Sequence, residues 1–134
     1  MSLTVSPELL TRAEAGDVDD ATFVDCIRES LPYPFELVES LTRRLAAGDV
    51  EPGSAFADNR EEPATEAARG QLLRAMASDA IRGALERHFD VRIAFQNCHR
   101  VAVFDPAPAA GAQFARFTSG RAQLLNQSPG LVNC

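Results

Sequence analysis

Apolar residues recur every three or four positions through the first third of the chain, which is the spacing of amphipathic helices. This pattern predicts three successive helices. The first begins at Ser6-Pro7, where an N-cap residue precedes a proline in the first helical position, and it ends near Gly16. The second ends at Pro32, and the third carries a leucine stripe and is capped by Gly48.

Residues 49–64 break the helical pattern and form a long acidic loop. Loops of this length are uncommon in compact domains, and those that occur are often functional. The aromatic residue of this segment is Phe56. Two interpretations stay open: Phe56 is tucked down and holds the loop to the surface, or it is exposed in a lid or a partner-binding loop.

A second helical run extends over residues 65–89, with Thr65 as its N-cap. Its apolar residues cover a broad arc, which is typical of a central helix that is contacted on more than one side. We therefore expect this helix to form the core. Ser78-Asp79 would act as an internal cap if the run is divided into two helices.

Residues 91–104 change from helical spacing to an alternation of apolar and polar positions, which predicts two short strands. A three-residue loop between the strands sets Phe95 opposite Val101 and Ile93 opposite Val103, so that one face of the hairpin is apolar. A two-residue loop would mix the two faces. We therefore predict a hairpin with the three-residue loop.

This register places Cys98 at the exposed tip of the hairpin, between Asn97 and His99. It also leaves Gln96 and Arg100 together on a polar face of the two strands.

A proline- and alanine-rich connector then leads to a closing helix over residues 113–127, and residues 127–134 form a mobile tail. The helical spacing predicts that four apolar residues of the closing helix face inward: Phe114, Phe117, Leu124 and Leu125.

Together these elements predict an α+β fold that is mainly α. About five helices are expected, with one antiparallel β-hairpin, residues about 91–104, packed on the long central helix, residues about 65–89. A length of 134 residues with 46% hydrophobic content fits one globular domain that spans residues 1–134.

Charge is distributed unevenly along the chain. Residues 1–66 carry 15 acidic residues and 5 arginines, a net charge of −10, whereas residues 67–134 carry 4 acidic residues and 8 arginines, a net charge of +4. All 13 basic residues are arginine, a preference that GC-rich coding bias explains. The asymmetry has two interpretations: the two halves attract each other, or the second half forms an anion-binding surface.

Three cysteines, Cys26, Cys98 and Cys134, form no paired motif, so free thiols are expected rather than disulfides. Cys26 lies at the edge of a helical apolar face and is predicted to be a partly buried, inert thiol. The spacing of cysteine and histidine does not match a structural zinc motif, and no metal or cofactor is predicted.

Several function classes are excluded or disfavoured by the sequence. The chain has no dinucleotide-binding, P-loop, zinc-protease or nucleophile-elbow motif. A pI near 4.8 and the absence of tryptophan argue against general nucleic-acid binding. No apolar run is long enough to span a membrane and no signal peptide is visible, so a cytoplasmic location is expected.

The first functional hypothesis is a small cytosolic interaction or regulatory module that binds a protein partner or a small anionic ligand. Its surface would be the hairpin with the neighbouring arginines, and the 49–64 loop would lie at the edge. The predicted binding residues are Arg92, Arg100, Gln96, Asn97 and Phe56. The oligomeric state is left open.

The alternative is a thiol-dependent or metal-binding enzyme with a site around Cys98, His99 and His88, in which Arg100 anchors an anion. Catalysis would need a base within hydrogen-bond reach of the thiol, and neighbouring side chains such as His99 usually point away from each other. His88 instead projects from the helical apolar arc, where a histidine is often bonded to backbone carbonyls.

Overall fold

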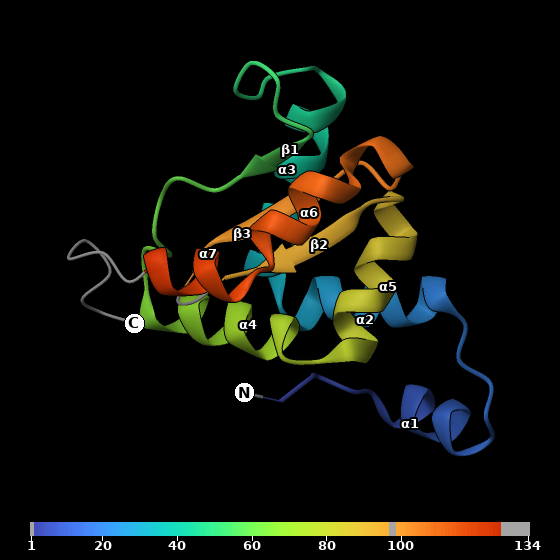
Figure 1. Ribbon diagram of the computed structural model, residues 1–134. Coiled ribbons are helices and arrows are strands. Elements are labelled where there is room, and N and C mark those ends of the chain that lie inside the picture. The colour runs from blue at the N-terminus through green and yellow to red at the C-terminus, as the bar shows by residue number, and fades with distance from the viewer. Residues whose placement is uncertain (1, 97–98, 127–134) are drawn as a thin grey trace.

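The computed structural model describes residues 2–96 and 99–126, and this part of the chain has a mainly helical α+β fold with a small antiparallel sheet (Figure 1). The helices are α1 (Pro7–Glu14), α2 (Asp20–Ser30), α3 (Pro32–Ala46), α4 (Glu66–Met76), α5 (Asp79–Phe89), the short 3₁₀ helix η1 (Pro108–Ala110), α6 (Gly111–Phe117) and α7 (Gly120–Leu125). The strands are β1 (Phe56–Asp58), β2 (Arg92–Phe95) and β3 (Val101–Phe104).

The predicted hairpin is confirmed, and its register is the one that the three-residue loop requires. Ile93 lies opposite Val103 and Phe95 opposite Val101. The residues at the tip, Asn97 and Cys98, lie outside the described residues, so the predicted exposure of Cys98 is not described.

The hairpin is joined by a third strand, which the sequence did not indicate. Strand β1 arises within the segment that was expected to be an acidic loop, and it pairs antiparallel with β3, giving the order β1-β3-β2. Phe56 lies opposite Phe104 in this pairing. The strand was missed because three residues are too few to establish an alternating pattern.

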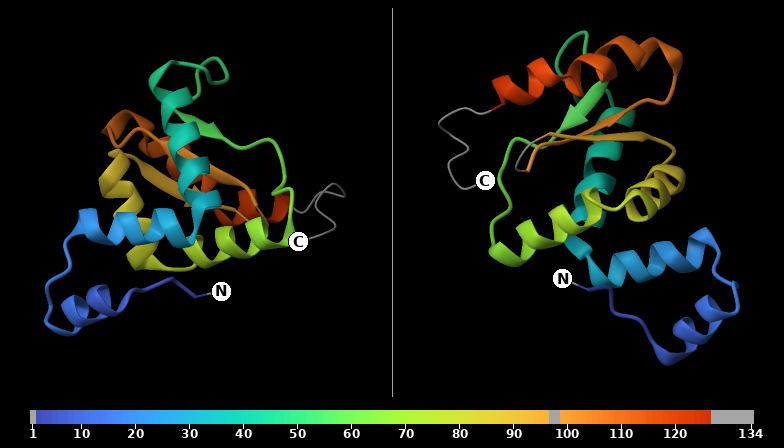
Figure 2. Two further views of the ribbon diagram at one scale, coloured as in Figure 1. Left: turned by 180° about the vertical axis from the view of Figure 1, so that it is seen from behind. Right: turned by 60° about the horizontal axis from the view of Figure 1, so that its bottom comes forward.

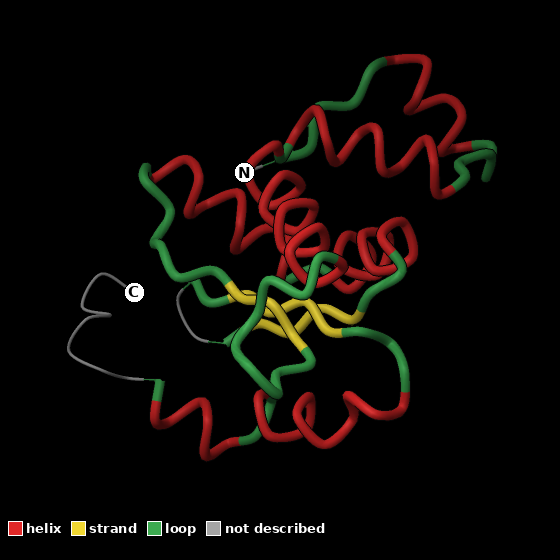
Figure 3. The backbone as a smooth tube through the Cα atoms, turned by 90° about the horizontal axis from the view of Figure 1, so that it is seen from above, coloured by secondary structure: helices red, strands yellow, loops and turns green. Residues whose placement is uncertain are grey.

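Helices cover both faces of the sheet. Figure 3 shows the sheet edge-on between two layers, and Figure 2 shows α3 crossing one face while α6 and α7 lie over the other. The main core fills the space between the sheet and α2–α5, and its fully buried side chains include Ile27, Leu31, Val38, Leu72, Leu85 and Val103. A second apolar cluster lies under α6 and contains Ala94, Ala102, Phe104, Ala110 and Phe117.

Residues 65–89 form two helices rather than one. The sequence had left this division open through an internal cap at Ser78-Asp79. Oγ of Ser78 accepts a hydrogen bond from the backbone N–H of Ile81 at 3.2 Å, which is the geometry of an N-cap, and α5 starts at the next residue. Not all of the apolar arc predicted over residues 65–89 is covered, because Leu73 is 45% exposed. The helix count therefore exceeds the expected five.

The closing helix is also divided, and this changes the direction of its leucines. Ser119 accepts from the backbone N–H of Ala122 at 3.1 Å and starts a new helix, α7, after a break at Thr118. Phe117 is buried as expected. Leu124 and Leu125 are 75% and 64% exposed, so the expectation that they face inward is wrong.

The N-terminal helix α1 forms where it was predicted, with Ser6 as its N-cap, yet none of its residues is buried. It lies beside α2 and away from the sheet (Figures 1 and 2). Cys26 of α2 is 6% exposed, and its Sγ donates to the backbone carbonyl of Thr4 at 3.4 Å. The thiol was predicted to be partly buried and is in fact buried, and its inertness stays a prediction.

Candidate functional site

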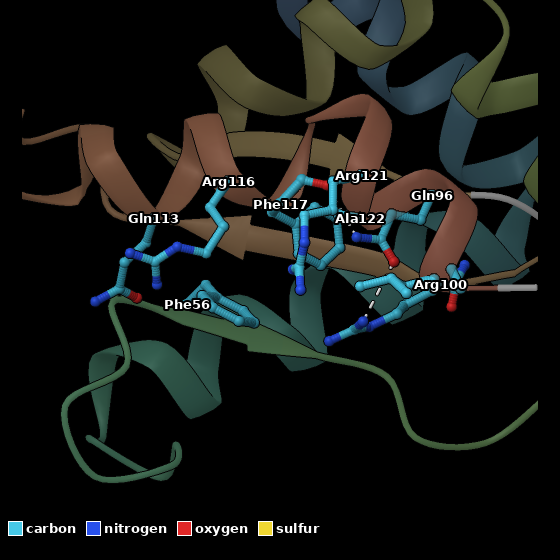
Figure 4. A pocket seen from close by; sticks show the side chains of 10 residues that line it. Phe56, Gln96, Arg100, Gln113, Arg116, Phe117, Arg121 and Ala122 are labelled. Carbon is cyan, nitrogen blue, oxygen red and sulfur yellow. Dashed lines mark hydrogen bonds between the residues drawn. The ribbon is translucent and has the colours of Figure 1, made fainter.

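A pocket of about 350 Å³ opens between the sheet and helices α6 and α7, on the face opposite the main core (Figure 4). Strand β1, the β2–β3 hairpin and both C-terminal helices contribute to it. Its aromatic and polar side chains are Phe56, Gln96, Arg100, Arg116, Phe117 and Arg121. The lining is completed by Gln113, Ala122, Leu125 and Asn126.

The apolar wall of the pocket is built on three phenylalanines. The ring centroid of Phe56 lies 4.8 Å from that of Phe104, with 33° between the ring planes, so one face of Phe56 covers Phe104. Phe117 meets Phe56 edge-on, at 5.6 Å and 64°. Because Phe104 is fully buried, these contacts fix the position of the partly exposed Phe56 ring.

Gln96 is a buried polar residue at the back of the pocket, with 3% of its surface exposed. Its Nε2 donates to the backbone carbonyl of Phe117 at 2.9 Å, and its Oε1 accepts from Nη1 of Arg100 at 3.2 Å. Gln96 therefore connects the hairpin to the end of α6. The face of the hairpin that was expected to be polar is in fact covered by α6.

Arg100 is held on three sides. Its Nε and Nη2 lie 2.9 and 2.8 Å from Oδ2 of Asp58, and its guanidinium lies over the Phe117 ring, 4.9 Å from the centroid. With Gln96 as well, most of its hydrogen-bonding capacity is used within the protein. Arg100 therefore forms a fixed part of the pocket wall, and its charge is largely balanced by Asp58.

Arg116 and Arg121 differ from Arg100, because neither has an ion pair or hydrogen bond from its side chain to another described residue. Nine of the 13 arginines pair with a carboxylate in the described part of the chain. Both side chains are exposed and line the pocket, and Figure 4 shows them extending from the C-terminal helices toward the side where Phe56 lies. Within the described part of the chain, the pocket therefore carries two cationic groups without a balancing acid.

Gln113 joins α6 to the segment before β1. Its Oε1 accepts from the backbone N–H of Ala55 at 2.8 Å, and its Nε2 donates to the carbonyl of Gly53 at 2.9 Å. Both ends of the amide are thus occupied. These two bonds hold Phe56 and the following strand against α6.

The structure brings three of the five predicted binding residues to this pocket, namely Phe56, Gln96 and Arg100. Arg92 lies on the same face of the sheet, but it stacks on Phe114, with 3.6 Å between its guanidinium carbon and the ring centroid. Asn97, the fifth, lies outside the described residues.

The residues of the predicted enzyme site are separated. His88, near the end of α5, is exposed and packs edge-on against Phe89, 4.6 Å between centroids. His99 follows β2 at the other end, where its backbone carbonyl accepts from Nδ2 of Asn59 at 2.6 Å. Strand β2, about 13 Å long, lies between the two histidines. Cys98 lies outside the described residues.

Arg116 and Arg121 were not singled out as site residues by the sequence reasoning. A signal was nevertheless present, because no acidic residue follows Asp105, so neither arginine has an acidic neighbour on its own helix. In contrast, the acidic partner of Arg100 is 42 positions away along the chain. Only the fold reveals that pair.

A larger cavity of about 680 Å³ lies between α3 and residues 49–64, and its chemistry is different. Its two arginines are both paired: Arg44 lies 3.7 Å from Asp49, and Arg60 lies 2.6 Å from Glu51. Burial raises the pKa of Tyr33 in this cavity, with a smaller contribution from Glu61. The described residues that line this cavity therefore offer no unbalanced arginine.

Among the described residues, no group of three or more histidine, cysteine, aspartate or glutamate side chains is placed to hold a metal ion. Nor does any helix in residues 2–96 and 99–126 combine the length and the apolar character needed to cross a bilayer.

Comparison with known proteins identifies the family. The sequence model of a family described as NucS shadow ORF, whose name carries the prefix KH, matches residues 1–134, so the chain belongs to this family. No curated protein and no solved structure matches the chain.

Proposed function

We propose that this member of the NucS shadow ORF family is a binding module, and that it takes an anionic ligand in the pocket between the sheet and helices α6 and α7. The observation that carries the proposal is the pair Arg116 and Arg121, two pocket arginines with no carboxylate partner among the described residues. A guanidinium offers a planar set of donors that fits a carboxylate or phosphate at two points.

The setting of the two arginines supports this role. They face an apolar wall that includes Phe56 and Phe117. Water competes less well for a charged group beside such a wall than on an open polar surface, so an ion pair formed there is stronger. No acidic residue follows Asp105, so the two arginines of α6 and α7 make this part of the surface locally positive, which favours an anion.

The lining favours binding over catalysis. Among the described residues, the lining holds arginine, glutamine, asparagine and apolar side chains, and none of them is a cysteine, histidine, serine, threonine, aspartate or glutamate. These are the side chains that most often act as nucleophile or general base. The two histidines of the alternative enzyme site, His88 and His99, lie at opposite ends of β2, so they do not form one site with each other.

The prefix KH in the family name raises single-stranded nucleic acid as another ligand. KH modules clamp the nucleic-acid backbone with a loop of sequence Gly-x-x-Gly, and no two glycines of this chain stand three positions apart. The turn between helices α4 and α5 consists of Ala77 and Ser78 and contains no glycine. With a pI near 4.8 as well, a small anion is the better-supported ligand.

The test is calorimetric titration of the purified protein with inorganic pyrophosphate. We expect saturable binding that the double variant Arg116→Gln/Arg121→Gln weakens at least tenfold. The matched control is Arg43→Gln/Arg74→Gln, which removes the same charge from α3 and α4, away from the pocket. No binding to the wild-type protein, or equal weakening by both double variants, would refute the proposed site.

A further inference from the structure

We infer that the ligand of this pocket is an aromatic phosphate of mononucleotide size, with a flat ring lying against Phe56 and a phosphate held by Arg116 and Arg121. This inference rests on the proposed function and names the class of anion. Its two parts, the ring and the phosphate, follow from separate features of the pocket.

The ring follows from the exposed face of Phe56. One face of this ring is covered by Phe104, at 4.8 Å between centroids, and the edge of Phe117 closes a second side. Phe56 remains partly exposed and lines the pocket, so its other face is available to a ligand (Figure 4). Bare phosphate would leave this apolar surface wet, whereas an offset aromatic ring would cover it.

The neighbouring guanidinium supports the same orientation. Arg100 is already fixed by Asp58 and Gln96 and lies over the Phe117 ring at 4.9 Å. Arginine planes stack on aromatic rings as well as donating hydrogen bonds. The pocket wall therefore presents one phenylalanine face and one fixed guanidinium, and both of these groups favour a flat π-system over an aliphatic chain.

The phosphate follows from the number of unbalanced cations. A single arginine satisfies a carboxylate through its paired donors, and Arg116 and Arg121 together provide two positive charges. A phosphate monoester carries about −1.5 to −2 charge at pH 7 and three acceptor oxygens, which matches two guanidinium groups. A carboxylate ligand would leave one of the two arginines without a counter-charge.

The size of the ligand is limited by the cavity. A volume of about 350 Å³ is close to the lower limit of small-molecule pockets, which is about 300 Å³. It accommodates a ring and one phosphate with its linking sugar, and it is too small to enclose a longer chain of nucleotides. A polymer would have to extend over the surface outside the pocket.

The test separates the ring from the phosphate with four probes: adenosine monophosphate, ribose 5-phosphate, adenosine and inorganic pyrophosphate. Each is titrated into the whole chain of residues 1–134 by calorimetry. We expect adenosine monophosphate to bind at least tenfold more tightly than ribose 5-phosphate, and adenosine alone to bind more weakly than either. The Arg116→Gln/Arg121→Gln variant should lose the preference for phosphate.

The ring contact is tested with Phe56→Leu, which keeps an apolar side chain and removes the flat face. We expect this variant to bind adenosine monophosphate at least fivefold more weakly, with ribose 5-phosphate unchanged. The control is Phe114→Leu, a partly buried phenylalanine of α6 that contacts Phe104 at 5.2 Å and does not line the pocket. A thermal melt of each variant shows whether the fold is kept.

The proposed anion site and the proposed aromatic ligand are refuted by different results. If pyrophosphate and ribose 5-phosphate bind as tightly as adenosine monophosphate, and Phe56→Leu changes nothing, the anion site stands and the aromatic ligand is refuted. If a single-stranded oligonucleotide binds far more tightly than the mononucleotide, the ligand is a polymer and the size argument is wrong. If no phosphate probe binds, the proposed function itself is refuted.

Discussion

Arginine has two different roles in the pocket, and the neighbours of each residue decide which one it takes. Arg100 is bonded to Asp58 and Gln96 and stacks on Phe117, so it holds the sheet and α6 together. Arg116 and Arg121 have no such partners among the described residues. Arg100 was predicted as a binding residue and, in the alternative hypothesis, as an anion anchor, and both roles stay predictions; the structure shows its guanidinium bonded to Asp58 and Gln96 in the pocket wall.

Gln96 joins Arg100 to the end of α6, and this connection gives the first prediction. Gln96→Leu removes the donor to the Phe117 carbonyl and the acceptor for Arg100 in a buried position. We expect the free energy of unfolding to fall by about 1–3 kcal/mol, because buried polar groups lose their partners. Urea denaturation monitored by circular dichroism measures this change.

A double-mutant cycle provides the control for Gln96. If Gln96 acts partly through Arg100, the costs of Gln96→Leu and Arg100→Leu will be less than additive when the two changes are combined. Full additivity would show that the bond of 3.2 Å between them contributes nothing to stability.

At the scale of elements, the C-terminal helices show how one N-cap residue changes the direction in which the following side chains point. Ser119 starts α7 on a new axis, so the periodicity that runs through Phe114 and Phe117 does not continue to Leu124. A prediction of one uninterrupted helix therefore places the leucines after the break on the apolar face, although they are exposed. The interruption was visible as Thr118-Ser119-Gly120, but these residues also occur within helices, so the pattern alone did not decide between one helix and two.

This break leads to the second prediction. Phe117→Ala should lower the free energy of unfolding by about 3–5 kcal/mol, because the ring is buried against Phe104 and Phe56. Leu124→Ala should change it by less than about 0.5 kcal/mol, since 75% of that residue is exposed. Chemical denaturation of the two variants compares them directly. A large loss in Leu124→Ala would mean that α7 buries this leucine in solution.

The start of α2 gives a prediction on pH. Hydrogen bonds from Arg87, with a smaller contribution from its charge, lower the pKa of Asp20, and hydrogen bonds from Thr22 lower the pKa of Asp19. Because both values are lower in the folded state, this contribution to stability is complete above the usual carboxyl range. It is lost as pH falls below about 4, through the lowered values.

The measurement is the melting temperature of the protein from pH 7 to pH 2.5. In Asp20→Asn we expect a lower melting temperature at pH 7 and a smaller further decline in acid, because the pair with Arg87 is already lost. The control is Asp25→Asn on the same helix, an exposed aspartate that lies 4.0 Å from Arg28. The same pH profile in both variants would contradict this prediction.

At the scale of the whole molecule, the sequence predicted which segments are helical and the pairing of the hairpin, because both are set by local periodicity. It did not predict β1, whose three residues are held by pairing with a strand more than 40 positions away. The pocket depends on the same long-range contacts, since Phe56 comes from β1 and Arg121 from α7. Phe56, Gln96 and Arg100 could be selected from the sequence, but their meeting at one place could not.

The helices differ in how many of their residues are buried, and this difference gives the last prediction. Helix α1 has eight residues and buries none of them, whereas α3 buries Phe35, Val38 and Leu41 in the main core. A helix of this length is marginal in water without tertiary contacts, so α1 should open locally while the rest of the protein stays folded. Hydrogen exchange of the backbone amides should therefore be orders of magnitude faster in α1 than in α3.

The exchange experiment also examines whether α1 has a partner in solution. The protein is measured at two concentrations that differ a hundredfold. Fast exchange in α1 at both would agree with a helix that buries no residue, although Ser6 caps it and the preceding Thr4 bonds to Ser30 Oγ at 2.8 Å and to the Cys26 thiol. Protection of α1 equal to that of α3 at both concentrations would contradict the prediction. Protection that appears only at the higher concentration would show that a second copy of the chain covers the exposed Leu10 and its neighbours.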